Sequence, residues 1–141
     1  MAFPRSAFDA TLGLIYFARM LDKMRLIRAG ELPDGYLPMI GEGFDGRICR
    51  FLNMDYAAVR DRAAMGGTDA EILEWCFQNG RRPSDEEIMV WNKYAAKAGW
   101  RDADNGATGR LEQNKADSGL GGRSDILTFF DYYEYDEGRR V

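Results

Sequence analysis

The order of hydrophobic and polar residues along the chain predicts a series of helices separated by turns. The first helix is expected over Thr11–Ala29, where apolar residues recur at helical spacing. Gly30 follows it as a residue suited to the left-handed position after a helix. Because the apolar surface of this segment is broad, we expect the helix to be central to the core.

Potential capping residues mark the next helices. Asp45 is expected to cap a short helix over Gly46–Leu52, and Asp55 to cap another over Tyr56–Met65. The intervening segment, 31–44, is rich in proline and glycine, which favour turns.

Two capping boxes are the strongest local signals in the chain. Thr68 is followed three residues later by Glu71, and Ser84 by Glu87. In this pattern the hydroxyl accepts a backbone N–H while the glutamate reaches back to the cap, so each pair predicts the start of a helix. These helices are expected to end near Gln78 and Ala98.

Two further helices are predicted towards the end of the chain. One covers Gly106–Ser118, and the last covers Asp125–Tyr135 with Ser124 as its cap. The last helix is expected to bury Ile126, Phe129, Phe130 and Tyr133. That choice leaves Tyr132 and Tyr135 on other faces, either as a partner surface or simply beside a helix docked on the core.

The pattern contains no convincing strand. The nearest is Tyr36–Ile40, and Pro38 would confine it to the edge of a sheet. The fold class is therefore all-α, and we expect one compact domain over residues 1–141 with about seven short helices and a central first helix.

The amino-acid composition excludes several classes of functional site. The 141 residues are 45% hydrophobic and 30% charged, with a net charge of −4 and an isoelectric point near 4.9. This charge argues against DNA binding by bulk electrostatics. The chain has no histidine, which excludes a His-ligated zinc, a proximal-His haem and a Ser-His-Asp triad within it. We therefore expect no cofactor and no metal.

The apolar run 12–18 has neither the flanks of a signal peptide nor the length of a membrane span. Two cysteines are too few for a secreted disulfide framework. A cytoplasmic location without membrane contact is expected.

Several stretches together resemble a bacterial family known only as domain of unknown function 5069. They are ARMLDK at 18–23, GEGFD at 41–45, GTDAEILEWCF at 67–77, NGRRPS at 79–84 and WN at 91–92. The resemblance covers about residues 5–140. It implies a small domain and carries no activity.

The segment Gly41–Gly46 has the spacing G-x-G-x-x-G of a dinucleotide-binding loop. Its setting lacks the strand and the βαβ unit that such a site requires, and Glu42 and Asp45 would place negative charge beside the phosphates. A glycine-rich turn is the simpler interpretation.

A mixed-charge pocket is the more attractive alternative. Arg19, Asp22 and Arg25 lie three residues apart on the first helix, with Lys23 among them, and Arg47 follows the glycine loop. Facing each other, these groups would hold a phosphate or carboxylate. The competing interpretation is a structural ion-pair network built from the same residue types.

Two hypotheses of function follow, with a weaker third. The first is a binding or interaction module, for an anionic small molecule or for a second copy of the chain as a homodimer. The second is a small metabolic enzyme whose acid or base is a tuned carboxylate. The third is RNA association through arginines and stacked aromatic residues. The candidate acids are Asp22, Glu42 and Asp45, and the candidate ligand-binding residues are Arg19, Lys23, Arg25, Arg47, Trp91 and Asn92.

Overall fold

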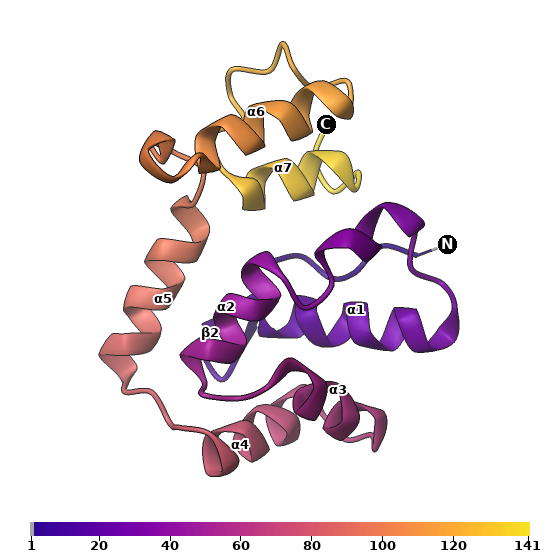
Figure 1. The fold of residues 1–141 in the computed structure, drawn as a ribbon, viewed down its shortest axis with the longest axis vertical. Helices are drawn as coiled ribbons and strands as arrows, with labels where there is room; N and C mark the ends of the chain where they lie inside the picture. The colour runs from indigo at the N-terminus through magenta and orange to yellow at the C-terminus, as the bar shows by residue number, and fades with distance from the viewer. Residues whose placement is uncertain (1) are drawn as a thin grey trace. The chain divides into compact units, whose positions relative to one another are not determined.

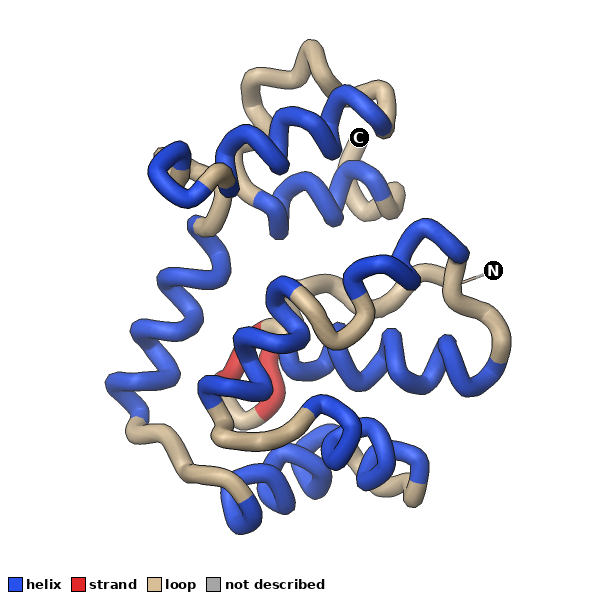
Figure 2. The backbone as a smooth tube through the Cα atoms, in the orientation of Figure 1, coloured by secondary structure: helices blue, strands red, loops and turns tan. Residues whose placement is uncertain are grey.

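A computed structural model describes residues 2–141 and confirms the helical class (Figures 1 and 2). Within these residues the chain forms seven α-helices, two 3₁₀-helices and one small sheet. The elements are β1 (Ala10–Thr11), β2 (Leu14–Ile15), α1 (Phe17–Ala29), η1 (Asp34–Met39), α2 (Gly43–Phe51), α3 (Tyr56–Ala64), α4 (Asp69–Asn79), α5 (Asp85–Lys97), η2 (Ala103–Asn105), α6 (Ala107–Asp117) and α7 (Phe129–Asp136). The chain divides into two compact units, and the boundary between Trp91 and Asn92 falls within α5.

The predicted start of the first helix is wrong. A hairpin precedes the helix, in which Ala10 pairs with Ile15 and Thr11 with Leu14. The two turn residues, Leu12 and Gly13, have φ angles of 49° and 81°. Left-handed φ at both central residues is the geometry of a tight hairpin turn, so the chain reverses where the apolar periodicity alone suggested a helix.

The end and the position of α1 are as predicted. Gly30 takes a left-handed φ of 71°, and its N–H donates to the carbonyls at the end of the helix. The helix packs against β1, α3 and α4 and is central to the first unit (Figure 1). Its buried apolar residues are Phe17, Ala18, Met20, Leu21 and Met24.

The region before and at the start of α2 differs from the prediction. The segment proposed as an edge strand lies largely in η1, with Pro38 inside the 3₁₀-helix. Helix α2 begins at Gly43 with Glu42 as its N-cap, so Asp45 is not the cap and lies buried in the first turn. A carboxylate in that position complements the helix dipole as well as a cap would, which explains the error.

Both capping boxes are confirmed. The Glu71 N–H donates to Thr68 Oγ1 at 3.1 Å, and the Thr68 N–H donates back to the Glu71 carboxylate at 3.3 Å. At the start of α5 the corresponding distances between Ser84 and Glu87 are 3.1 and 2.9 Å.

The second unit contains α6 and α7 around Leu111 and Ile126. Helix α7 begins at Phe129, four residues later than expected, because Thr128 rather than Ser124 is its cap; Thr128 Oγ1 accepts the Asp131 N–H at 3.1 Å. Tyr132, which the pattern placed on a different face from the buried residues, is itself buried in the core of this unit. Its hydroxyl hydrogen-bonds to Ser118, which follows α6, so of the two alternatives for Tyr132 the structure has docking on the core.

Candidate functional site

The candidate acid Asp45 lies in a buried polar cluster with two residues of the α1 region. Lys23 Nζ lies 2.8 Å from Asp45 Oδ1, and the Tyr16 hydroxyl donates to the same oxygen at 2.7 Å. Lys23 also donates to the Tyr16 oxygen at 2.9 Å. The second carboxylate oxygen accepts the Gly41 N–H at 3.1 Å. Since Asp45 has no exposed surface, its carboxylate is fully engaged within the fold.

This cluster explains the glycine loop without a nucleotide. The Gly41 amide is a donor that a phosphate would need, and the Asp45 carboxylate already binds it. Gly46 is required by packing, because a Cβ there would lie 2.9 Å from the Gly41 carbonyl oxygen. The loop is preceded by η1, whereas a dinucleotide site needs a strand in this place.

The cluster also affects two neighbouring groups. Burial, and secondarily the negative charge of Asp45, raise the pKa of the Cys49 thiol to about 12. The same two causes raise the pKa of Tyr56 to about 12. Both side chains therefore stay protonated at neutral pH.

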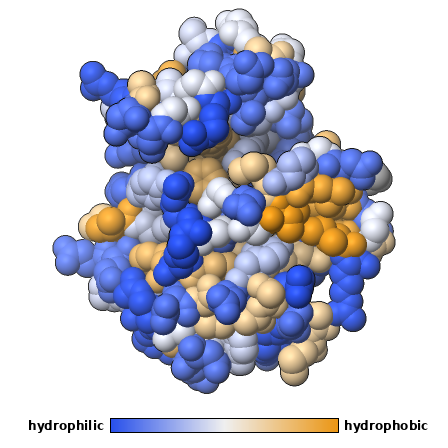
Figure 3. Space-filling model, in the orientation of Figure 1, coloured by the Kyte–Doolittle hydropathy of each residue, from blue (hydrophilic) through white to orange (hydrophobic). Residues whose placement is uncertain are grey.

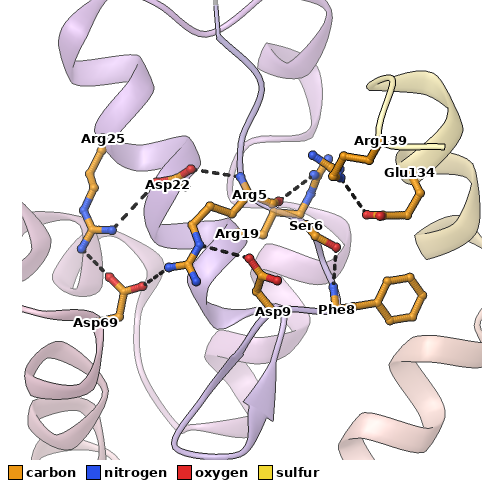
Figure 4. A network of polar contacts seen from close by, with 10 residues as sticks. All are labelled: Arg5, Ser6, Phe8, Asp9, Arg19, Asp22, Arg25, Asp69, Glu134 and Arg139. Carbon is orange, nitrogen blue, oxygen red and sulfur yellow. Dashed lines mark hydrogen bonds and ion pairs between the residues drawn. The ribbon is translucent and has the colours of Figure 1, made fainter.

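The other charged residues predicted on α1 belong to a second network (Figure 4). Arg5 and Arg25 hold the two oxygens of Asp69, at 2.8 and 2.7 Å. Arg5 also pairs with Asp9 at 3.1 Å, and its backbone N–H donates to Asp22 at 3.0 Å. The network thus ties the N-terminal segment to α1 and to the first residue of α4.

Arg19 joins this network through the backbone. It is 2% exposed, and its Nη1 donates to the Arg5 carbonyl at 3.1 Å (Figure 4). Asp22 and Lys23 are adjacent in sequence but contact different groups, because consecutive residues point about 100° apart around a helix. The structure therefore brings Lys23 to Asp45 and places the carboxylate of Asp22 with Arg5.

The remaining predicted residues are scattered. Glu42 is exposed at the N-cap of α2, and Arg47 is exposed on that helix. Trp91 is 5% exposed, donates its indole N–H to the Ile15 carbonyl at 3.1 Å and stacks on Phe51 at 5.3 Å between ring centroids. Asn92 is half-buried at the start of the second unit.

A cleft in the first unit lies where α3 ends and α4 begins. It is a shallow depression open to solvent, with a volume of about 650 Å³. Its lining combines apolar, acidic and basic side chains with the two glycines of the α3–α4 turn: Ala58, Asp61, Arg62, Met65, Gly66, Gly67, Glu71 and Trp75.

Arg62 is the basic group of this cleft. Its Nη1 donates to the Gly66 carbonyl at 2.8 Å, which fixes the guanidinium beside the turn. Within residues 2–141 the guanidinium has no second hydrogen bond and no ion pair. Its remaining N–H groups have no acceptor among the described residues.

The apolar walls of the cleft are Met65 and Trp75. Met65 is 80% exposed, which is unusual for a large apolar side chain, and Trp75 is half-buried. The flexible, polarisable methionine side chain adapts to ligands of different shape. The indole of Trp75 adds a rigid apolar surface to the lining.

Sequence reasoning missed this cleft because no motif marks it. The sequence pattern predicts a role for Glu71 only in a capping box. The signal that could have found it is an arginine and a methionine in the last turn of one helix, two glycines, and a tryptophan two turns into the next. Only the packing of α3 against α4 brings these residues together.

Residues 2–141 contain neither a metal-binding cluster nor a membrane-spanning helix. No group of three or more cysteine, aspartate or glutamate side chains lies close enough to hold a metal ion. No helix in this part of the chain has the length and hydropathy needed to cross a membrane.

An apolar surface patch lies over η1 (Figure 3). Leu37 and Met39 of this helix are 51% and 56% exposed. A homodimer stays a prediction, and this patch is the apolar surface on which we would look for it.

Comparison with known proteins assigns the family. A family model described as Domain of unknown function (DUF5069) matches residues 1–139. The chain belongs to this family. The DUF5069 description carries no activity, and a comparison with curated proteins found no match. The function of this DUF5069 chain must therefore be argued from its own side chains.

Proposed function

We propose that this protein is a non-catalytic binding module that holds a small molecule with an anionic group in the α3–α4 cleft. The observation that carries the proposal is the state of Arg62, whose guanidinium lines the cleft, is anchored by one hydrogen bond and has no other acceptor within residues 2–141. Arginine recognises carboxylates and phosphates through such parallel N–H groups.

Two of the three carboxylates suggested for catalysis are held in contacts within the fold, which supports binding rather than acid–base chemistry. Asp45 is closed to solvent and bound to Lys23 and Tyr16, and Asp22 accepts a backbone N–H. General acid–base catalysis needs a carboxyl group within hydrogen-bond reach of a substrate. The buried cluster and the surface network both act as structural elements instead.

A cytoplasmic location is part of the same proposal. Cys49 and Cys76 are both free and buried, which suits a reducing compartment.

The test uses a pair of probes that differ only in charge, 4-methylpentanoate and 4-methylpentanamide. Binding is measured by titration of a ¹⁵N-labelled sample, with the Gly66 and Gly67 amides and the Trp75 indole as reporters of the cleft. We expect the acid to bind at least about tenfold more tightly than the amide, because only the acid gives a charge-assisted hydrogen bond to Arg62.

The variants separate Arg62 from general surface charge. Arg62→Met should weaken binding of 4-methylpentanoate about tenfold, because the charged donor is lost. Arg110→Met is the matched control, since Arg110 is an exposed arginine on α6 and does not line the cleft. Equal binding of acid and amide, or equal effects of the two variants, would contradict the proposal.

A further inference from the structure

We infer that the ligand of the α3–α4 cleft is a zwitterion, a free amino acid with an apolar side chain. This inference rests on the proposed function. It adds that the ligand carries a positive charge beside its anionic group, and that its chemical class is the amino acids. Three features of the cleft carry it: the pairing of its charges, the position of Glu71 relative to Arg62, and the apolar walls.

The cleft is lined by two carboxylates, Asp61 and Glu71, and by one guanidinium, Arg62. Asp61 also pairs with Arg60 at 3.2 Å at the exposed surface, so the lining has more negative than positive charge and favours a ligand that brings a cation. A ligand with only a negative charge would bind Arg62 but meet Glu71 as a like charge. A ligand that carries an ammonium group beside its carboxylate satisfies both residues.

Gly67 shows that the two charged groups share one side of the turn. The position that a Cβ on Gly67 would take lies 3.6 Å from Arg62 Nη2 and 3.6 Å from Glu71 Oε2. The two atoms thus converge on one small volume, which this glycine leaves empty. In an amino acid the carboxylate and ammonium groups are carried by a single carbon, so one α-carbon placed above Gly67 can serve both.

Glu71 is oriented for this role by the capping box. Its Oε1 accepts hydrogen bonds from the N–H and the hydroxyl of Thr68, at 3.3 and 3.1 Å. Within residues 2–141 no hydrogen-bond donor or ion-pair partner contacts Oε2. The carboxylate is therefore held in place by one oxygen and presents the other, so little side-chain entropy is lost when an ammonium group binds.

The apolar walls select the side chain. Met65 and Trp75 line the same cleft as the two charged groups. A ligand whose amino and carboxylate groups lie at Gly67 can extend an aliphatic or aromatic side chain between them, where its burial removes apolar surface from water.

The experiment compares three probes: L-leucine, 4-methylpentanoate, which lacks the amino group, and N-acetyl-L-leucine, whose amine is uncharged. We expect L-leucine to bind at least about tenfold more tightly than either analogue, because only it pairs with Glu71. Glu71→Gln should abolish this preference and leave the affinity for 4-methylpentanoate unchanged or higher. Glutamine also serves in a capping box, so this variant keeps the start of α4.

A pair of glycine variants tests the geometry. Gly66 and Gly67 both have positive φ, at 88° and 102°, so alanine strains the backbone at either position. Only at Gly67 would the added methyl group stand between Arg62 and Glu71; at Gly66 it meets nothing within 4 Å. Gly67→Ala should weaken L-leucine binding about tenfold more than Gly66→Ala does, because it fills the ligand's position.

The outcomes separate this inference from the function on which it rests. If 4-methylpentanoate and L-leucine bind equally and Glu71→Gln changes neither, the zwitterion is wrong and an anion-binding module remains. If none of the three probes shifts the Gly66, Gly67 and Trp75 signals at millimolar concentration, both the inference and the proposed function are overturned.

Discussion

At the scale of single residues, burial sets the protonation state of the two cysteine thiols. Burial raises the pKa of Cys49 to about 12 and that of Cys76 to about 11. For Cys76 the positive charge of Arg62 acts in the opposite direction, with the smaller effect. Both thiols are therefore inert as nucleophiles at neutral pH, although the sequence contains them as free cysteines.

This leads to a prediction about alkaline stability. The thiols ionise near their ordinary pKa of 9.0 in the unfolded chain but only near 11 or 12 in the folded chain. Their stabilising contribution is complete below about pH 9 and is lost as the pH rises towards the folded values, by about 1.4 kcal/mol per pH unit for each thiol. Urea denaturation from about pH 8 to about pH 10.5 measures this slope.

The variant Cys76→Ala is the control for that measurement. This variant should make the fall of the unfolding free energy with pH less steep by about 1.4 kcal/mol per pH unit, because one titrating thiol is removed. The cavity that it leaves lowers the stability at every pH and does not change this slope. An unchanged slope would show that Cys76 is not buried as a protonated thiol.

At the scale of elements, one buried ion pair connects α1 to α2. Lys23 and Asp45 lie 2.8 Å apart and are almost fully buried, and Tyr16 hydrogen-bonds to both. Removing one member leaves the other charge unpaired in the core, which is more costly than replacing both members.

A double-mutant cycle tests this coupling. Lys23→Met alone is expected to lower the free energy of unfolding by about 3 kcal/mol, because the Asp45 carboxylate loses its cation. Adding Asp45→Asn to that variant should cost less than Asp45→Asn costs in the wild type. Lys93→Met on the exposed side of α5 is the matched control and should change stability by less than about 0.5 kcal/mol. If the stability changes of the two single variants simply add up in the double variant, Lys23 and Asp45 are not energetically coupled.

The start of α7 gives a second prediction at this scale. Thr128 caps the helix, and Ser124, four residues earlier, does not. Thr128→Ala should therefore lower the free energy of unfolding by about 1 kcal/mol, whereas Ser124→Ala should leave it nearly unchanged. Chemical denaturation of the two variants distinguishes these positions. A larger loss of stability for Ser124→Ala than for Thr128→Ala would show that the helix begins after Ser124, as the sequence suggested.

At the scale of the whole molecule, charge limits the partners. The chain carries 19 basic and 23 acidic residues, and much of the basic charge is taken up by ion pairs such as those of Arg5, Arg25 and Lys23. A protein that binds nucleic acid by electrostatics needs basic residues left to contact phosphates.

We accordingly expect no retention on immobilised heparin at neutral pH and low ionic strength. Heparin is a polyanion that mimics a nucleic-acid backbone, so the measurement tests both DNA binding and the RNA alternative. Retention that is reversed by salt would contradict this expectation and favour RNA association.

The sequence by itself determined the helical class and most of the helix ends. The two capping boxes and Gly30 are local signals, satisfied by residues within one turn of each other, and the structure has them in the predicted places. The hairpin and the start of α7 escaped prediction because a left-handed Leu12 and the choice of Thr128 over Ser124 depend on how the flanking segments pack.

The arrangement of charged side chains was decided only by the tertiary structure. The sequence named Lys23 and Asp45, but their direct contact requires α2 to pack on α1. Asp22 meets Arg5 only because the N-terminal segment folds back against α1. The α3–α4 cleft depends in the same way on Arg62 and Glu71 approaching one another across a turn. Local hydrogen bonds can be predicted from neighbours in sequence, whereas a site is set by distances between residues that only folding brings together.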